Sequence, residues 1–162
     1  MQGRRWGLPL AALALAGAVA SVWSVHRLPR PAQAAPVAAT AGEHAQVVPY
    51  SQQRLDDLRA AGRVVLVNMT ADWCITCKAN EKAVFARDGF RDALQAADAV
   101  YMVGDWTDVD PAITAYLKRY GSVGVPLYVV YPRGGGEGTV LPTVLTPGRV
   151  QDALAQASQA GR

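Results

Sequence analysis

Apolar and polar positions along residues 50–162 follow two repeating patterns. Continuous apolar runs rich in β-branched residues predict buried strands at 64–69, 99–105 and 125–131. Apolar residues three or four positions apart predict helices at 51–61, 74–85, 88–97, 110–121 and 146–157. A glycine-rich turn at 132–138 leads into a short strand at 139–141, which predicts an antiparallel hairpin before the last helix.

Strands that alternate with helices place this part of the chain in the α/β class. That order implies parallel strands joined by right-handed crossovers, with helices on the faces of the sheet. Together with the final hairpin, it predicts a central mixed β-sheet flanked by helices.

The first 49 residues differ in composition from the rest. Gly7–Val25 contains no charged residue and follows a short basic stretch. It fits either a membrane anchor, for which it is just long enough, or a signal peptide cleaved after the small residues at 18–20. We therefore expect a signal peptide or anchor at 1–25, a flexible Pro/Ala-rich linker at 26–49 and one folded domain at 50–162. Either alternative would export the domain.

Charge and cysteine content exclude several classes of function. The formal net charge is +3, and it arises in residues 1–50, because Lys+Arg and Asp+Glu balance in residues 51–162. A neutral domain argues against nucleic-acid binding, which needs a basic face. The chain has 2 Cys, too few for a four-cysteine zinc site or a disulfide-rich mini-protein, and no metal site is predicted.

The two cysteines are the strongest chemical signal in the sequence. Cys74 and Cys77 lie where a predicted strand passes into a predicted helix. The free N–H groups of a helix N-terminus stabilise a thiolate, and cysteines in such motifs have pKa values of about 3.5–7.5. Cys74 is the predicted nucleophile, and the more buried Cys77 is placed to attack the resulting mixed disulfide. A structural disulfide or an inert pair are the alternatives.

The longer motif resembles a known family. Residues 71–78 (Ala-Asp-Trp-Cys-Ile-Thr-Cys-Lys) are similar to the active-site stretch of thioredoxin-fold proteins. With further blocks at 104–107, 110–111 and 124–128, the chain resembles the C-terminal domain of DsbD-type thiol:disulfide interchange proteins over about residues 50–160. The resemblance implies a thioredoxin-like fold and dithiol–disulfide exchange with no cofactor other than the redox-active pair.

The resemblance also implies a setting and partners. These are the periplasmic side of the bacterial inner membrane, a membrane dithiol electron donor, and oxidised protein substrates such as disulfide isomerases or the apocytochromes of cytochrome c biogenesis. It implies that the bond before Pro126 is cis, and that the backbone of Val125 pairs with the bound substrate segment.

Five further residues are candidates for supporting the dithiol. Trp73 is expected to offer apolar surface to partners or simply to pack, and Asp72 and Lys78 are flanking charges that either tune the thiolate or are solvated. Asn68 is a departure, because the family carries a buried Asp there and an amide cannot titrate. Glu81 is the candidate replacement, with an ordinary ion pair to Lys78 as the alternative.

Three functions remain open from the sequence. The first is an extracytoplasmic thiol:disulfide reductase acting on partner proteins. The second is a thiol oxidase or isomerase on the same fold, and the third is a non-catalytic binding module. The intact Cys-x-x-Cys motif argues against the third, because a binding scaffold needs no thiols.

Overall fold

The computed structural model describes residues 47–160. The elements in chain order are β1 (Val47–Pro49), α2 (Gln52–Ala60), β2 (Val64–Thr70), α3 (Ile75–Asn80), the π-helical turn η1 (Glu81–Phe85), α4 (Asp88–Ala96), β3 (Ala99–Asp105), α5 (Pro111–Arg119), β4 (Leu127–Tyr131), β5 (Thr139–Val140) and α6 (Pro147–Gln159). The predicted anchor or signal peptide at 1–25 and most of the predicted linker lie outside the described residues. Between residues 47 and 160, no helix has the length and apolar character needed to cross a bilayer.

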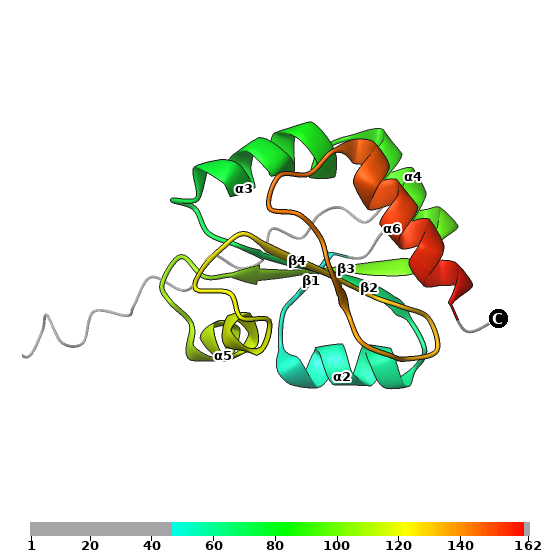
Figure 1. The fold of residues 1–162 in the computed structure, drawn as a ribbon, viewed down its shortest axis with the longest axis horizontal. Helices are drawn as coiled ribbons and strands as arrows, with labels where there is room; N and C mark the ends of the chain where they lie inside the picture. Colours follow the sequence, from blue (N-terminus) through cyan, green and yellow to red (C-terminus); the bar gives the residue numbers. More distant parts are fainter. Residues whose placement is uncertain (1–46, 161–162) are drawn as a thin grey trace, which may run out of the picture. The chain divides into compact units, whose positions relative to one another are not determined.

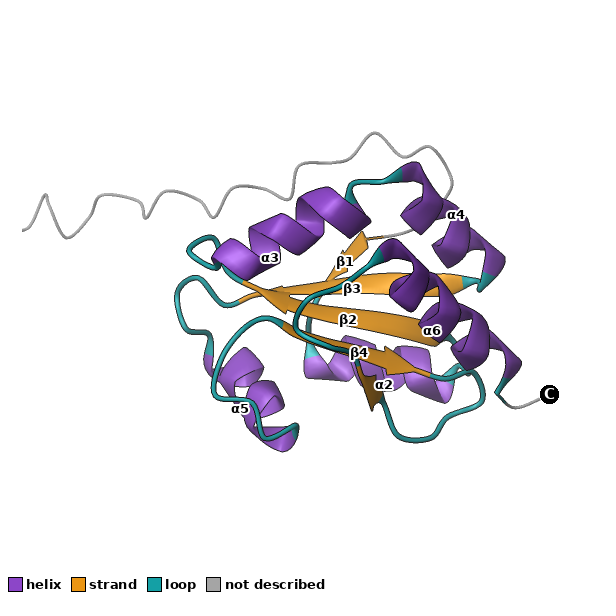
Figure 2. Ribbon diagram, turned by 45° about the horizontal axis from the view of Figure 1, so that its top comes forward, coloured by secondary structure: helices purple, strands orange, loops and turns teal. Residues whose placement is uncertain are grey.

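The five strands form one mixed sheet in the order β1-β3-β2-β4-β5 (Figures 1 and 2). β1, β3 and β2 are parallel, whereas β4 is antiparallel to β2 and β5 is antiparallel to β4. The predicted α/β class and the final hairpin are confirmed. The implied parallel direction of β4 is wrong, because a strand buried at every position has no side-chain pattern that reports its direction.

Helices cover both faces of this sheet. α3, α4 and α6 lie on one face, and α2 and α5 lie on the other (Figure 1). Alternate residues of β2 supply the two cores: Val64 and Leu66 pack with α4 and α6, while Val65 and Val67 pack with α2 and α5. This alternation explains why β2 reads as one continuous apolar run.

The boundary of the linker needs a correction. Val47–Pro49, placed at the end of the linker by sequence, forms the edge strand β1, which pairs with β3. The Tyr50 N–H extends this pairing by donating to the Val103 carbonyl at 2.8 Å. Three half-exposed residues are too few to show the alternation that identifies a strand, and Pro49 is acceptable at an edge.

Local capping determines where the helices begin. The Ser51 side chain accepts from the Arg54 N–H, and Asp110 accepts from the N–H groups of Ala112 and Ile113, with Pro111 in the first turn. Both caps lie at the predicted starts of these helices, residues 51 and 110. The predicted helix at 74–85 is divided into α3 and η1, and the predicted strand at 125–131 begins at Leu127 because Pro126 has no N–H to give to a ladder.

Candidate functional site

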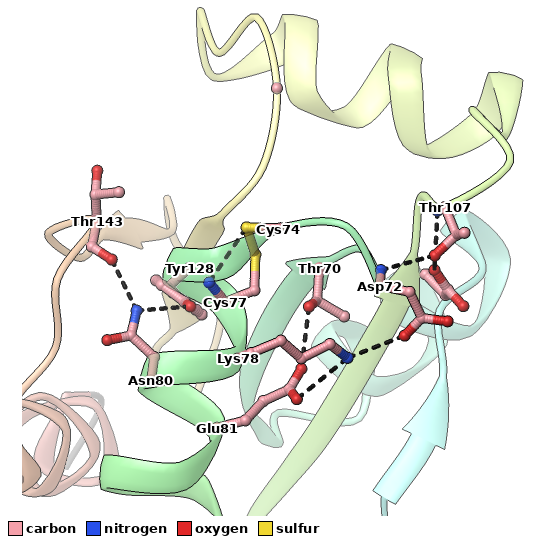
Figure 3. The surroundings of a disulfide bond; sticks show 12 residues. Thr70, Asp72, Cys74, Cys77, Lys78, Asn80, Glu81, Thr107, Tyr128 and Thr143 are labelled. Atoms are coloured by element: carbon pink, nitrogen blue, oxygen red, sulfur yellow. Dashed lines mark hydrogen bonds and ion pairs between the residues drawn. A yellow bond between two sulfur atoms is a disulfide. The ribbon is translucent and has the colours of Figure 1, made fainter.

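The dithiol lies at the junction of β2 and α3. The chain leaves β2 through a turn in which the Cys74 N–H donates to the Ala71 carbonyl at 3.1 Å. Cys74 is the N-cap of α3, and its sulfur accepts from the Cys77 N–H at 3.2 Å (Figure 3). Cys74 and Cys77 are joined in a disulfide. The predicted position of the pair, at a strand-to-helix junction and one helical turn apart, is confirmed.

Both cysteines are buried, Cys77 more completely than Cys74. Cys74 is 6% exposed and Cys77 is 1% exposed. Ala71 and Val125 pack around them, and the Val125–Pro126 peptide bond is cis, as the resemblance implied. Val125, which precedes Pro126, therefore contacts the cysteine pair, and Cys74 is the more exposed of the two residues.

Apolar side chains stand exposed beside the pair. Ile75, between the cysteines, is 86% exposed, and Trp73 is 55% exposed. The Trp73 ring lies 6.0 Å from that of Trp106, whose Nε1 donates to Thr114 at 2.8 Å. Trp73 therefore presents a large part of its ring to solvent next to Cys74.

Lys78 connects the two flanking acids. Its Nζ lies 2.9 Å from an Asp72 oxygen and 3.4 Å from Oε2 of Glu81, while the Thr70 hydroxyl donates to Oε1 of Glu81 at 3.1 Å (Figure 3). The hydrogen bond to Asp72, followed by the charge of Glu81, raises the pKa of Lys78. Both Glu81 oxygens are engaged, and the ion pair with Lys78 that the sequence offered as the alternative is present.

Asn68 is buried in β2, with 2% of its surface exposed. Its Nδ2 donates to the Tyr101 hydroxyl at 2.6 Å, and its Oδ1 has no hydrogen-bond partner within residues 47–160. Burial raises the pKa of Tyr101, which keeps that hydroxyl neutral. The buried position that the family fills with an acid therefore holds an uncharged pair here.

Two residues that support the site were missed by sequence. Asn80 is buried near the end of α3, donates to the Tyr128 hydroxyl and the Thr143 carbonyl, and accepts from the Leu145 N–H. Thr107 contacts the turn before Cys74. An Asp-x-Thr sequence that begins at the last residue of a predicted strand was the available signal for Thr107, because the carboxyl ends of neighbouring parallel strands meet at one edge of a sheet.

Comparisons with known proteins agree with this geometry. A family model described as thioredoxin-like matches residues 46–132. The thiol:disulfide interchange protein DsbD of Pseudoalteromonas atlantica is 33% identical over 86 residues, which are 53% of this chain and 14% of that protein. DsbD of Escherichia coli K12 is 32% identical over 80 residues, covering 49% of this chain and again 14% of the relative. The chain therefore spans only about a seventh of these relatives.

Solved structures show the same fold. The oxidised C-terminal domain of Neisseria meningitidis DsbD superposes with a TM-score of 0.56 at 20% identity, covering 69% of this chain and 99% of that domain. A thioredoxin from Thermus thermophilus superposes with a TM-score of 0.56 at 23% identity, covering 73% of this chain and 90% of the other. At these identities the likeness concerns the fold.

Proposed function

The chain belongs to the thioredoxin-like family, and from this premise we propose that it is an extracytoplasmic thiol:disulfide reductase acting on partner proteins through Cys74 and Cys77. The observation that carries the proposal is the Cys74–Cys77 disulfide at the N-terminus of α3, with Cys74 the more exposed of the two residues. In a dithiol at this position, one sulfur can attack a partner disulfide, and the second can then release the partner from the mixed disulfide.

The proposed reaction is two successive sulfur exchanges. In the reduced protein the Cys74 thiolate attacks a partner disulfide, a Cys74–partner bond forms, and the partner's other sulfur leaves as a thiolate. Cys77, as a thiolate, then attacks the Cys74 sulfur, the internal disulfide closes, and the partner's second sulfur leaves. Two electrons pass to the partner, and a donor dithiol restores the reduced protein by the reverse exchange.

The site supports a role for each neighbouring residue. The Cys77 N–H that bonds the Cys74 sulfur stabilises negative charge there. Trp73 and Ile75 offer apolar contact to a partner, and the backbone at Val125, before the cis Pro126, is the proposed site of pairing with a substrate segment.

The setting and partners are part of the same proposal. The donor is a membrane dithiol carrier, and the protein works on the periplasmic side of the bacterial inner membrane, anchored or released through its N-terminal segment. Oxidised isomerases or apocytochromes are the proposed acceptors. Similarity to DsbD over half of the chain supports this setting, as does the uncharged stretch Gly7–Val25 in the sequence.

Measuring the reduction potential of the Cys74–Cys77 pair in glutathione buffers tests the direction of electron flow. We expect a value nearer the roughly −270 mV of thioredoxin than the roughly −120 mV of a strong oxidant. A potential near −120 mV would identify an oxidase instead. A pair that forms no reversible disulfide would leave only a binding module.

The roles of the two sulfurs can be tested by trapping. Cys77→Ala removes the resolving sulfur, so mixed disulfides between Cys74 and partner proteins should accumulate and appear as high-mass bands on non-reducing gels. Cys74→Ala is the matched control and should trap few. Equal trapping by the two variants would contradict the assignment, and the proteins caught by Cys77→Ala would identify the partners.

A further inference from the structure

Thr107, in the loop after β3, contacts both central residues of the turn that leads to Cys74. Its hydroxyl oxygen accepts from the Asp72 N–H at 2.9 Å (Figure 3), and its backbone carbonyl accepts from Nε1 of Trp73 at 3.3 Å. The ends of the same turn are joined by the bond from Cys74 to Ala71. One residue of a separate loop therefore holds the middle of the turn from outside.

Thr107 is itself fixed by the sheet. Its hydroxyl and its N–H both donate to Oδ1 of Asp105, the last residue of β3. A hydroxyl has one proton, so donation to the carboxylate leaves only lone pairs to face the Asp72 N–H, and the negative charge strengthens them as acceptors. Asp105 pairs with Thr70, the last residue of β2, so the support starts from the ends of two neighbouring strands, one of which leads into the turn before Cys74.

We propose that Thr107 is a positioning residue that keeps Cys74 within reach of Cys77 whenever no covalent bond joins them; this inference rests on the proposed exchange function. In the oxidised protein the disulfide holds Cys74 in place. In the reduced protein and in the mixed disulfide that bond is absent, and Cys74 is held by the turn, the helix cap and the packing of Ala71 and Val125. In those two states Thr107 keeps the turn close to the conformation that the disulfide requires, and it therefore favours closure of the internal disulfide.

The consequence for the chemistry is an effect on the rate and stability with which the internal Cys74–Cys77 disulfide forms. When the Cys77 thiolate attacks Cys74, the internal disulfide forms, the bond from Cys74 to the partner breaks, and the partner leaves as a thiolate. A loosely held turn lowers the effective concentration of one sulfur at the other. Without the Thr107 contact the closure is slower, the internal disulfide is less stable relative to the dithiol, and the reduction potential is less negative.

The test compares Thr107→Val, which keeps the shape and removes the hydroxyl, with Thr107→Ser, which keeps the hydroxyl. Loss of one hydrogen bond should lower the equilibrium constant for disulfide formation about fivefold in Thr107→Val, which corresponds to about 20 mV toward less negative potential. The mixed disulfide with glutathione, quenched with acid and measured by mass spectrometry, should persist about fivefold longer. Thr107→Ser should restore both values.

Two controls separate positioning from general damage. Thr139→Val makes the same replacement on the exposed strand β5 and should leave both quantities at wild-type values. Asp105→Asn weakens the acceptor that fixes the Thr107 hydroxyl and should shift the potential in the same direction, which gives a second measurement if Thr107→Val does not fold.

Three outcomes would overturn the inference: an unchanged potential and closure rate in Thr107→Val, equal shifts in the Val and Ser variants, or an Asp105→Asn protein identical to wild type when Thr107→Val is unfolded. Failure of the proposed function would look different, because the wild-type protein itself would then form no reversible disulfide with glutathione.

Discussion

Glu81 and Asn68 determine which polar groups lie near the dithiol. Asn68 is uncharged and buried, so the only carboxylate that the family pattern leaves for tuning the pair is Glu81. The structure gives both Glu81 oxygens other partners, in the Lys78 ammonium and the Thr70 hydroxyl. Its influence on the cysteines is therefore expected to be weak.

Glu81→Gln should change the pH midpoint of Cys74 alkylation by less than about 0.7 unit. An exposed ion pair is worth about 0–1 kcal/mol, and one pKa unit corresponds to about 1.36 kcal/mol. The shift should be downward, because Lys78 loses one of its two counter-charges, and Lys78→Gln is the matched control that should shift the midpoint upward. The rate of iodoacetamide reaction between pH 5 and 9 measures both. A fall of more than one unit would instead show that the Glu81 carboxylate acts directly on the thiols.

Single residues with strong local chemistry could be predicted from sequence, whereas residues that act through distant contacts could not. Cys74 and Cys77 are identified by spacing alone. Asn80 and Thr107 are ordinary polar residues in sequence. Their importance depends on partners 34 to 65 positions away, at Asp72, Trp73, Tyr128, Thr143 and Leu145, which only the folded chain brings near.

At the scale of elements, the sequence predicts whether a segment is a helix or a strand better than it predicts the direction of a strand or the division of a helix. β2 and β3 lie where strands were predicted, because continuous runs of apolar, β-branched residues mark them clearly. The antiparallel direction of β4 was not predicted, since both of its faces are buried and the pattern is the same either way. The change from α3 to η1 also lacks a sequence signal, because both kinds of helix place apolar residues at similar spacings.

Across the whole domain, each of the two cores contains two buried tyrosines. Tyr101 and Tyr128 lie in one core, and Tyr116 and Tyr131 lie in the other. Burial raises the pKa of all four from the ordinary value of 10.0. Burial also raises the pKa of Tyr50 to about 12. Each hydroxyl therefore stays protonated in the folded protein under conditions in which the unfolded chain ionises.

The free energy of unfolding should be nearly constant from pH 8 to 9 and fall as the pH rises past about 10. A group whose pKa is raised by folding contributes its stability below the pKa of the unfolded chain and loses it above that value, by up to about 1.36 kcal/mol per pH unit for each tyrosine. Urea titrations of the oxidised protein at each pH measure this slope. Tyr101→Phe should reduce the slope by the share of one group, even if it lowers stability at every pH. An identical slope in that variant would show that Tyr101 already ionises normally in the folded state.

The hydrogen bond from the Cys77 N–H to the Cys74 sulfur is present while the two sulfurs are still joined. The N–H dipole that stabilises a thiolate at Cys74 is thus oriented before the disulfide is reduced. In bulk water, the water molecules would first have to reorient around the new charge. The same readiness applies when the charge departs. In the proposed exchange reaction, the surroundings of the Cys74 sulfur therefore do not have to rearrange, either when negative charge forms on it or when that charge is lost.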